Sequence, residues 1–138
     1  MSKLWFTADT HFGHANIIRY CKRPFTSVEE MDQTLINNIN ELVQTEDTLY
    51  HLGDFSFGRQ SKTNNAARYL EQIKCKKVII IPGNHDPHYA TGLPREEFAQ
   101  LFAGCYPFLR LKTKWGDERL EIFMLLASRK PLGLQPRG

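Results

Sequence analysis

KVIIIPGNHD, residues 77–86, sets a β-branched apolar run directly before a cluster of polar residues. The run at 77–81 is apolar almost throughout, as expected of a strand buried on both faces of a parallel sheet. A proline and a glycine then mark the end of the strand, and Asn-His-Asp follows. The segment therefore predicts a buried strand with polar side chains at its carboxyl end.

The same arrangement of an apolar run followed by polar residues occurs twice earlier in the chain. One strand is expected at 4–8, before Asp9-Thr10-His11, and another at 48–52, before Gly53-Asp54. Helical periodicity, a capping box of Ser27 with Glu30 and proline signals predict four helices. The expected helices are 15–21, 27–43, 62–73 and 94–102.

The order of these elements predicts an α/β fold. Strands that alternate with helices imply parallel pairing through crossover connections. Two further apolar segments, 108–113 and 119–126, are separated only by a short turn at 115–117, so we expect them to form an antiparallel hairpin.

The polar clusters are expected to meet. Because the carboxyl ends of parallel strands converge on one crevice, Asp9, His11, Asp54, Asn84 and His85 should lie close together. Carboxylate, imidazole and amide groups suit Mn²⁺, Fe²⁺, Zn²⁺ or Ni²⁺. Without a cation, two nearby aspartates would repel each other and raise each other's pKa.

Each cluster alone has a simpler interpretation, since an aspartate at a strand end is usually a turn or helix cap. The conjunction of three clusters, each after a buried strand, favours a functional site. Gly53 and Gly83 are expected where the chain turns sharply with positive φ. His51 fits a hydrogen-bonded strand histidine better than a site residue, and Arg23 fits a solvated helix end better than a phosphate contact.

These motifs resemble the calcineurin-like metallophosphoesterase family, whose opening pattern is D-x-H, G-D and G-N-H-[DE]. Residues 9–17 and Arg23-Pro24-Phe25 are similar to a compact bacterial and phage branch, and the resemblance covers about residues 3–126. It implies a sandwich of two sheets flanked by helices, and hydrolysis of a phosphate ester by a two-metal mechanism.

The resemblance also implies roles for individual residues. Asp9 and His11 would hold the first metal, Asp54 would bridge both metals, and Asn84 would hold the second metal and touch the phosphate. His85 would be the catalytic histidine. The branch resemblance suggests that His14 contacts the substrate or supports a metal ligand, and an exposed loop histidine is the equal alternative.

The family pattern continues with a histidine after the next strand and then G-H-x-H, but none of the five histidines here follows His88. We therefore expect an incomplete phosphoesterase domain at 1–127, with part of the second sheet missing, and an irregular basic tail at 128–138. A truncated or frameshifted gene product would have this form. The second metal should bind weakly in such a domain. The alternative to an impaired enzyme is a non-catalytic remnant or binding module of the same fold. We also expect the apolar strand 120–126 to self-associate.

The composition limits the classes of partner that we expect for this protein. The net charge of +3 lies entirely in residues 128–138, which hold three basic residues and no acid, so the rest carries 15 basic and 15 acidic residues. Equal numbers of basic and acidic residues in 1–127 argue against a dedicated nucleic-acid surface there. The remaining alternative is that the basic tail at 128–138 binds nucleic acid. We expect neither a membrane span nor a signal peptide, and three widely spaced cysteines predict free thiols in the cytoplasm.

Overall fold

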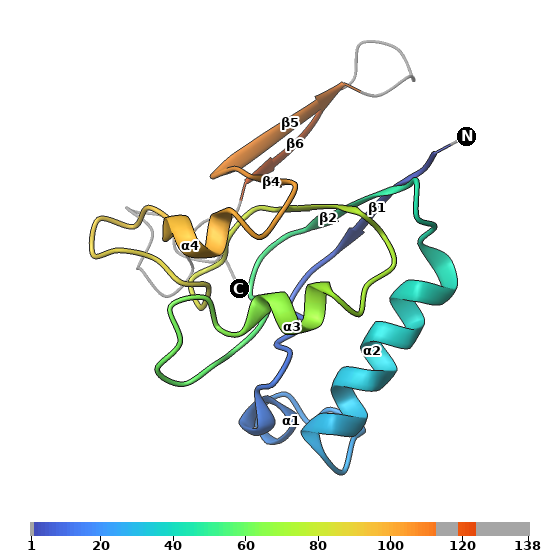
Figure 1. Cartoon of the computed structure of the whole chain (residues 1–138), viewed down its shortest axis with the longest axis vertical. Helices are drawn as coiled ribbons and strands as arrows, with labels where there is room; N and C mark the ends of the chain where they lie inside the picture. Colours follow the sequence, from blue (N-terminus) through green and yellow to red (C-terminus); the bar gives the residue numbers. More distant parts are fainter. Residues whose placement is uncertain (1, 113–118, 124–138) are drawn as a thin grey trace, which may run out of the picture.

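The structure is a computed structural model that describes residues 2–112 and 119–123. Its elements follow the order β1 (Leu4–Thr7), α1 (Ala15–Tyr20), α2 (Val28–Leu42), β2 (Thr48–His51), α3 (Ala66–Leu70), β3 (Lys77–Ile80), α4 (Glu96–Ala99), β4 (Gly104–Cys105), β5 (Phe108–Lys112) and β6 (Arg119–Phe123). The strands and helices of the first 80 residues alternate along the chain, as predicted (Figure 1).

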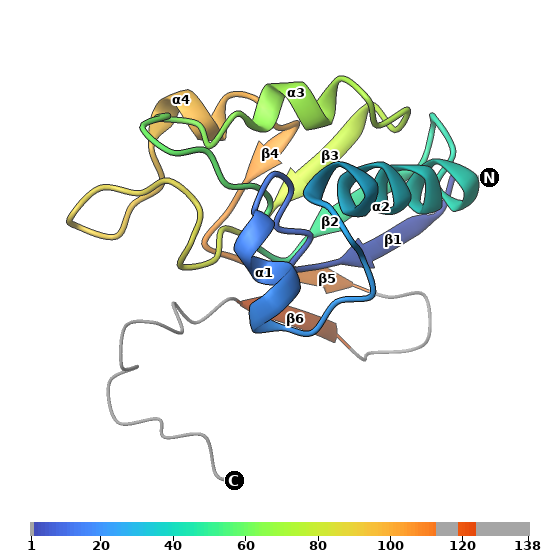
Figure 2. The ribbon, with the colours of Figure 1, turned by 90° about the horizontal axis from the view of Figure 1, so that it is seen from below.

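Four strands form a parallel sheet in the order β1-β2-β3-β4. The register pairs Thr7 with His51 and His51 with Ile80, so the carboxyl ends of the first three strands lie level with one another. Figure 2 shows α2, α3 and α4 together on one face of this sheet, with the β5–β6 hairpin on the other side. The predicted α/β class with parallel crossovers is therefore confirmed.

Burial across the sheet follows strand position. Both central strands are buried except at Lys77, whereas β1 lies at the edge and leaves Leu4 and Phe6 56% and 41% exposed. The expectation of a buried first strand was therefore wrong for those two side chains, because exposure alternates along β1 and both point to the same, less covered face of the sheet. The core lies between the sheet and its helices; it includes Phe12, Ile36, Val43, Leu49, Phe55, Tyr69, Val78, Ile80 and Phe98.

Helix α2 begins as its capping signal predicts. The hydroxyl of Ser27 accepts a hydrogen bond of 3.1 Å from the backbone N–H of Glu30. The Glu30 carboxylate does not complete the reciprocal bond to Ser27. It accepts from the backbone N–H and the hydroxyl of Thr26 at 3.2 and 2.6 Å instead.

Three elements differ from the sequence-based expectation. Helix α3 is shorter than 62–73, because Asn64 and Asn65 both adopt left-handed backbone conformations that a helix cannot continue through. Helix α4 is likewise shorter than 94–102. The two-residue strand β4 was not predicted, since its extended form arises from pairing with β3 rather than from a local pattern.

The last two strands pair antiparallel, from Phe108 with Phe123 to Lys112 with Arg119, which confirms the predicted hairpin. Its turn at 115–117, residues 124–126 and the tail at 128–138 lie outside the described residues. Self-association through strand 120–126 thus stays a prediction. Within the described part of the chain, no helix is both long and apolar enough to cross a bilayer.

Candidate metal centre

The loops that follow β1 and β2 run side by side beyond the sheet. The backbone N–H groups of Asp9 and His11 donate to the carbonyls of Gly53 and Asp54 at 2.9 and 3.0 Å. A further bond of 3.0 Å joins Phe12 to Phe55. Backbone pairing therefore holds the D-x-H and G-D segments together at the carboxyl ends of the strands.

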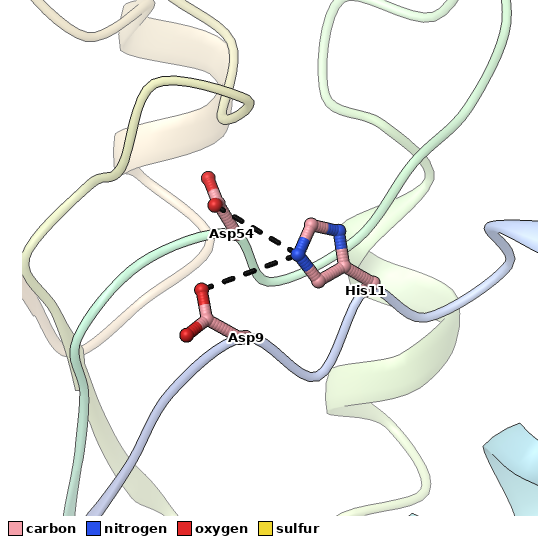
Figure 3. Close-up of side chains that lie close together, drawn as sticks. All are labelled: Asp9, His11 and Asp54. Carbon is pink, nitrogen blue, oxygen red and sulfur yellow. Dashed lines mark ion pairs between the residues drawn. The ribbon is translucent and has the colours of Figure 1, made fainter. Parts of the chain in front are cut away.

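Three predicted site residues meet at this point, as Figure 3 shows. Nε2 of His11 lies 4.0 Å from Oδ1 of Asp9 and 3.8 Å from Oδ2 of Asp54. These three residues can each offer a ligand atom such that all three atoms lie within 4.8 Å of one another. Donors that each lie about 2.1 Å from one cation are at most about 4.2 Å apart, so both measured distances suit a shared cation.

The same three residues have unusual backbones. Asp9, His11 and Asp54 adopt φ values of 54°, 50° and 55°, in the left-handed region that side-chain-bearing residues rarely occupy. Such conformations cost roughly 1–3 kcal/mol each and gather at functional sites. In these conformations the side chains of the three residues, which come from the loops after β1 and β2, point toward one another.

The electrostatics of the cluster favour a cation. Burial raises the pKa of Asp9, and repulsion from Asp54 raises it further. Burial lowers the pKa of His11 to about 4, although Asp54 opposes that shift. At neutral pH His11 is therefore uncharged, the form in which imidazole binds metals.

His14 and His85 stand beside this cluster. Nδ1 of His14 lies 3.5 Å from Nδ1 of His11, on the side of the ring away from the carboxylates. Metal-binding histidines commonly donate their second ring N–H to a carboxylate, a backbone carbonyl or a water molecule; here His14 occupies that position beside Nδ1 of His11. The ring of His85 is centred 5.8 Å from that of His11, and its side chain is exposed.

A hydrogen bond connects the loop after β3 to Asp54. Oδ1 of the Asp54 carboxylate accepts this bond, of 2.9 Å, from the backbone N–H of His85. Asn84 is half-buried between Gly83 and His85, and its role as a ligand stays a prediction.

Gly53 and Gly83 are required for different reasons. Gly53 has φ of +106°, as predicted, and a Cβ there would lie 2.6 Å from the backbone nitrogen of Gly83. Gly83 does not have positive φ, so that expectation was wrong. A Cβ on Gly83 would instead lie 2.6 Å from Oδ1 of Asp54, and the glycine is there to let the carboxylate approach.

Asp86 supports the site. From the sequence alone it is interpreted only as a residue that could cap a loop. Its buried carboxylate accepts from the backbone N–H groups of Asp54, Phe55 and Gly83 at 2.8, 2.9 and 2.8 Å. Burial raises its pKa to about 6 despite those bonds. Asp86 thus joins the loops after β2 and β3, and its place within G-N-H-D was the available signal.

Arg23 is a second supporting residue. Its guanidinium donates to the backbone carbonyls of Asp9 and Thr10 at 2.6 and 3.1 Å. The prediction of a solvated helix end was therefore wrong, because the side chain reaches back to the first strand-end loop and braces it.

His51 is a structural histidine, as predicted. It is 1% exposed, and Nδ1 accepts from the backbone N–H of Gly53 at 3.2 Å. That bond leaves Nε2 as the donor to the Thr10 hydroxyl, which lies 2.9 Å away and itself donates to the carbonyl of Phe55. Burial lowers the pKa of His51 to about 3.

Comparison with known proteins gives a consistent result. The family model described as calcineurin-like phosphoesterase matches residues 2–128. An uncharacterized protein of Methanocaldococcus jannaschii, MJ1445, is 46% identical over 86 residues, which cover 62% of this chain and 48% of that protein. The gene 66 protein of Mycobacterium phage L5 is 34% identical over 107 residues, or 77% of this chain and 48% of the phage protein.

Among solved structures, the protein of unknown function AQ665 from Aquifex aeolicus is similar, with a TM-score of 0.64 and 28% identity. The match covers 86% of this chain and 57% of the Aquifex chain. The present chain spans about half the length of the curated relatives that it matches.

Proposed function

Because this chain belongs to the calcineurin-like phosphoesterase family, we propose that it hydrolyses phosphate mono- or diesters with the help of two divalent cations. The observation that carries the proposal is the group of Asp9, His11 and Asp54, whose ligand atoms lie within 4.8 Å of one another. The group stands where parallel α/β sheets bind their ligands. We also infer that the parallel sheet and the β5–β6 hairpin belong to the two-sheet sandwich of the family.

The proposed ligand roles follow the family motifs. Asp9 and His11 would hold the first cation, Asp54 would serve both cations, and Asn84 would serve the second cation and the phosphate. When bound, two cations supply positive charge at the phosphoryl oxygens and lower the pKa of a water molecule. Mn²⁺, Fe²⁺, Zn²⁺ and Ni²⁺ all suit this donor set.

Two features of the geometry support these roles. The two carboxylate oxygens of Asp54 have separate environments, since Oδ1 accepts from the His85 N–H and Oδ2 lies 3.8 Å from His11. A carboxylate fixed in this way is suited to bridging. We propose that His85 donates a proton to the leaving oxygen, a role worth roughly 10²–10⁴-fold in rate; its imidazole is exposed, and its ring centroid lies 5.8 Å from that of His11.

We propose that the second cation binds more weakly than the first. Among the described residues, Asp9, His11 and Asp54 form a group of three ligand atoms for one cation, whereas the second cation would share Asp54 and rely on Asn84. Fewer ligands give lower affinity, and even the partners that orient ligands are worth roughly 10–100-fold. This observation also favours the alternative function, a binding module of the same fold that takes up one cation without turnover.

Hydrolysis of bis-p-nitrophenyl phosphate in the presence of Mn²⁺ tests the proposal. Asp54→Ala should abolish hydrolysis, and His85→Ala should reduce it by roughly 10²–10⁴-fold while Mn²⁺ binding persists. His88→Ala is the matched control, because His88 lies in the same loop and its ring nitrogen Nδ1 lies 2.8 Å from the backbone carbonyl oxygen of Asp86. Turnover that is unchanged in either of the first two variants would refute the assignment, whereas Mn²⁺ binding without any turnover would support the binding module.

A further inference from the structure

A row of rings leads outward from the metal centre. His14 lies beside His11, with 5.6 Å between their ring centroids. The His14 ring also stacks on Phe57, with centroids 4.6 Å apart and an angle of 20° between the planes. The Phe57 ring is thus one ring removed from a proposed cation ligand.

Phe57 is held in place but remains open to solvent. Its backbone N–H donates to the carbonyl of Phe12 at 2.8 Å, as part of the pairing between the first two strand-end loops. Its side chain is nevertheless 42% exposed. A single exposed phenylalanine is ordinary, but a fixed exposed ring beside a metal centre offers a flat surface to whatever binds there.

A cavity of about 320 Å³ adjoins this ring. The residues that line it include two aromatic, two basic and two acidic ones: Phe57, Tyr69, Arg59, Arg68, Glu29 and Asp32. Ligand sites typically have volumes of roughly 300–1,000 Å³ and combine aromatic walls with a few polar groups. The cavity therefore has the size and the mixed lining of a ligand site.

The lining chemistry selects among phosphate esters. A sugar phosphate has no flat apolar face to set against Phe57, and a lipid chain would leave the charged walls without partners. A nucleobase presents a flat π face for stacking and an edge of hydrogen-bond donors and acceptors for Arg59, Arg68 and Glu29.

We propose that the surface formed by Phe57 and the adjoining cavity binds the base of a nucleoside phosphate ester while the ester's phosphate lies at the metal centre. The proposal rests on the proposed function, which places the phosphate at Asp9, His11 and Asp54. His14 orients Phe57 by stacking beneath it and so links the base site to the metal site.

Calorimetric binding of adenosine 5′-monophosphate and ribose 5-phosphate to the full chain, with and without Mn²⁺, tests the inference. The two probes share the sugar phosphate and differ in the base. The nucleotide should bind more tightly, and Phe57→Ala and Phe57→Leu should weaken it roughly 5- to 150-fold, the worth of one base–aromatic stack. Phe57→Trp keeps a ring and should retain binding.

Phe108→Ala is the matched control, since this phenylalanine is 57% exposed and lies on β5. Equal affinities for the two probes, or equal effects of Phe57→Ala and Phe57→Leu on both, would overturn the base site. If both probes bind equally and only with Mn²⁺, the base site fails while the proposed function stands. Binding of the nucleotide that depends on Phe57 but not on Mn²⁺ would support the base site and count against the metal role, and no binding of either probe would overturn both.

Discussion

Gly83→Ala should damage metal binding more than it damages folding. The backbone of Gly83 does not have positive φ, so alanine fits the local conformation. The new Cβ would lie 2.6 Å from Oδ1 of Asp54 and 3.0 Å from the Asp54 nitrogen. The nearest clash is thus with a side chain, and the side chain is the proposed bridging ligand.

The magnitude follows from that contact. A carbon and an oxygen in ordinary contact are about 3.3 Å apart, so the Asp54 carboxylate must move by more than about 0.5 Å, the tolerance of a working site. Its bond to the His85 N–H, now 2.9 Å, would be strained by the same movement. We expect Mn²⁺ affinity to fall by roughly 10–100-fold, the loss typical of a misplaced ligand. Crowding should cost about 1–3 kcal/mol of stability, partly offset by the lower entropy of the unfolded chain.

Gly53→Ala is the comparison variant, because it combines φ of +106° with backbone contacts of 2.6 and 2.8 Å to Gly83. It should cost roughly 3 kcal/mol or more, since neither the conformation nor the backbone can yield easily. Urea unfolding of the metal-free proteins and Mn²⁺ titration by calorimetry give the two quantities. Normal Mn²⁺ affinity in Gly83→Ala, or equal stability losses in the two variants, would refute this reasoning.

Three further predictions concern the supporting residues. Arg23→Lys should lower Mn²⁺ affinity by roughly 10-fold in a calorimetric titration, because one ammonium group cannot span the carbonyls of Asp9 and Thr10; unchanged affinity would show that the bracing is dispensable. Thr10→Val should cost about 1–3 kcal/mol in urea unfolding, since it leaves Nε2 of the buried His51 without its hydroxyl partner and removes one of the two hydrogen bonds to the Phe55 carbonyl, which keeps the bond from the Phe12 N–H; a loss below about 0.5 kcal/mol would count against that network. Because the pKa of His51 is lowered, the folded state binds fewer protons than the unfolded state below pH 6.5. The free energy of unfolding of the wild type should therefore decrease by about 2 kcal/mol as the pH is lowered from 6.5 to 5, and that of His51→Gln should decrease less. Parallel profiles of unfolding free energy against pH would contradict the assignment.

Local signals account for the parts of the fold that the sequence predicted. Strands β2 and β3 are apolar runs with clear ends, and Ser27 caps α2 whatever the rest of the chain does. Strand β4 exists only because Ile79 and Ile80 pair with it, and the start of α3 depends on two left-handed asparagines. Side-chain chemistry alone does not reveal such long-range or conformational effects.

The candidate site divides in the same way. Convergence of parallel strand ends was enough to predict that Asp9, His11 and Asp54 meet, because topology fixes where strand ends lie. Arg23 bonds backbone carbonyls 13 and 14 residues away, and Asp86 bonds backbone N–H groups 31 and 32 residues away as well as that of Gly83; nothing in their own segments identifies the distant partners. The steric role of Gly83 likewise needs the distance to Asp54, which only the folded chain defines.

The central claim, that the strand-end cluster is a metal centre, is tested most directly by crystals grown with Mn²⁺ and measured for anomalous scattering. We expect a manganese peak within about 2.0–2.3 Å of donor atoms of Asp9, His11 and Asp54, the range seen for divalent cations in protein sites. Manganese bound only elsewhere, or no peak near these residues at saturating Mn²⁺, would contradict the account.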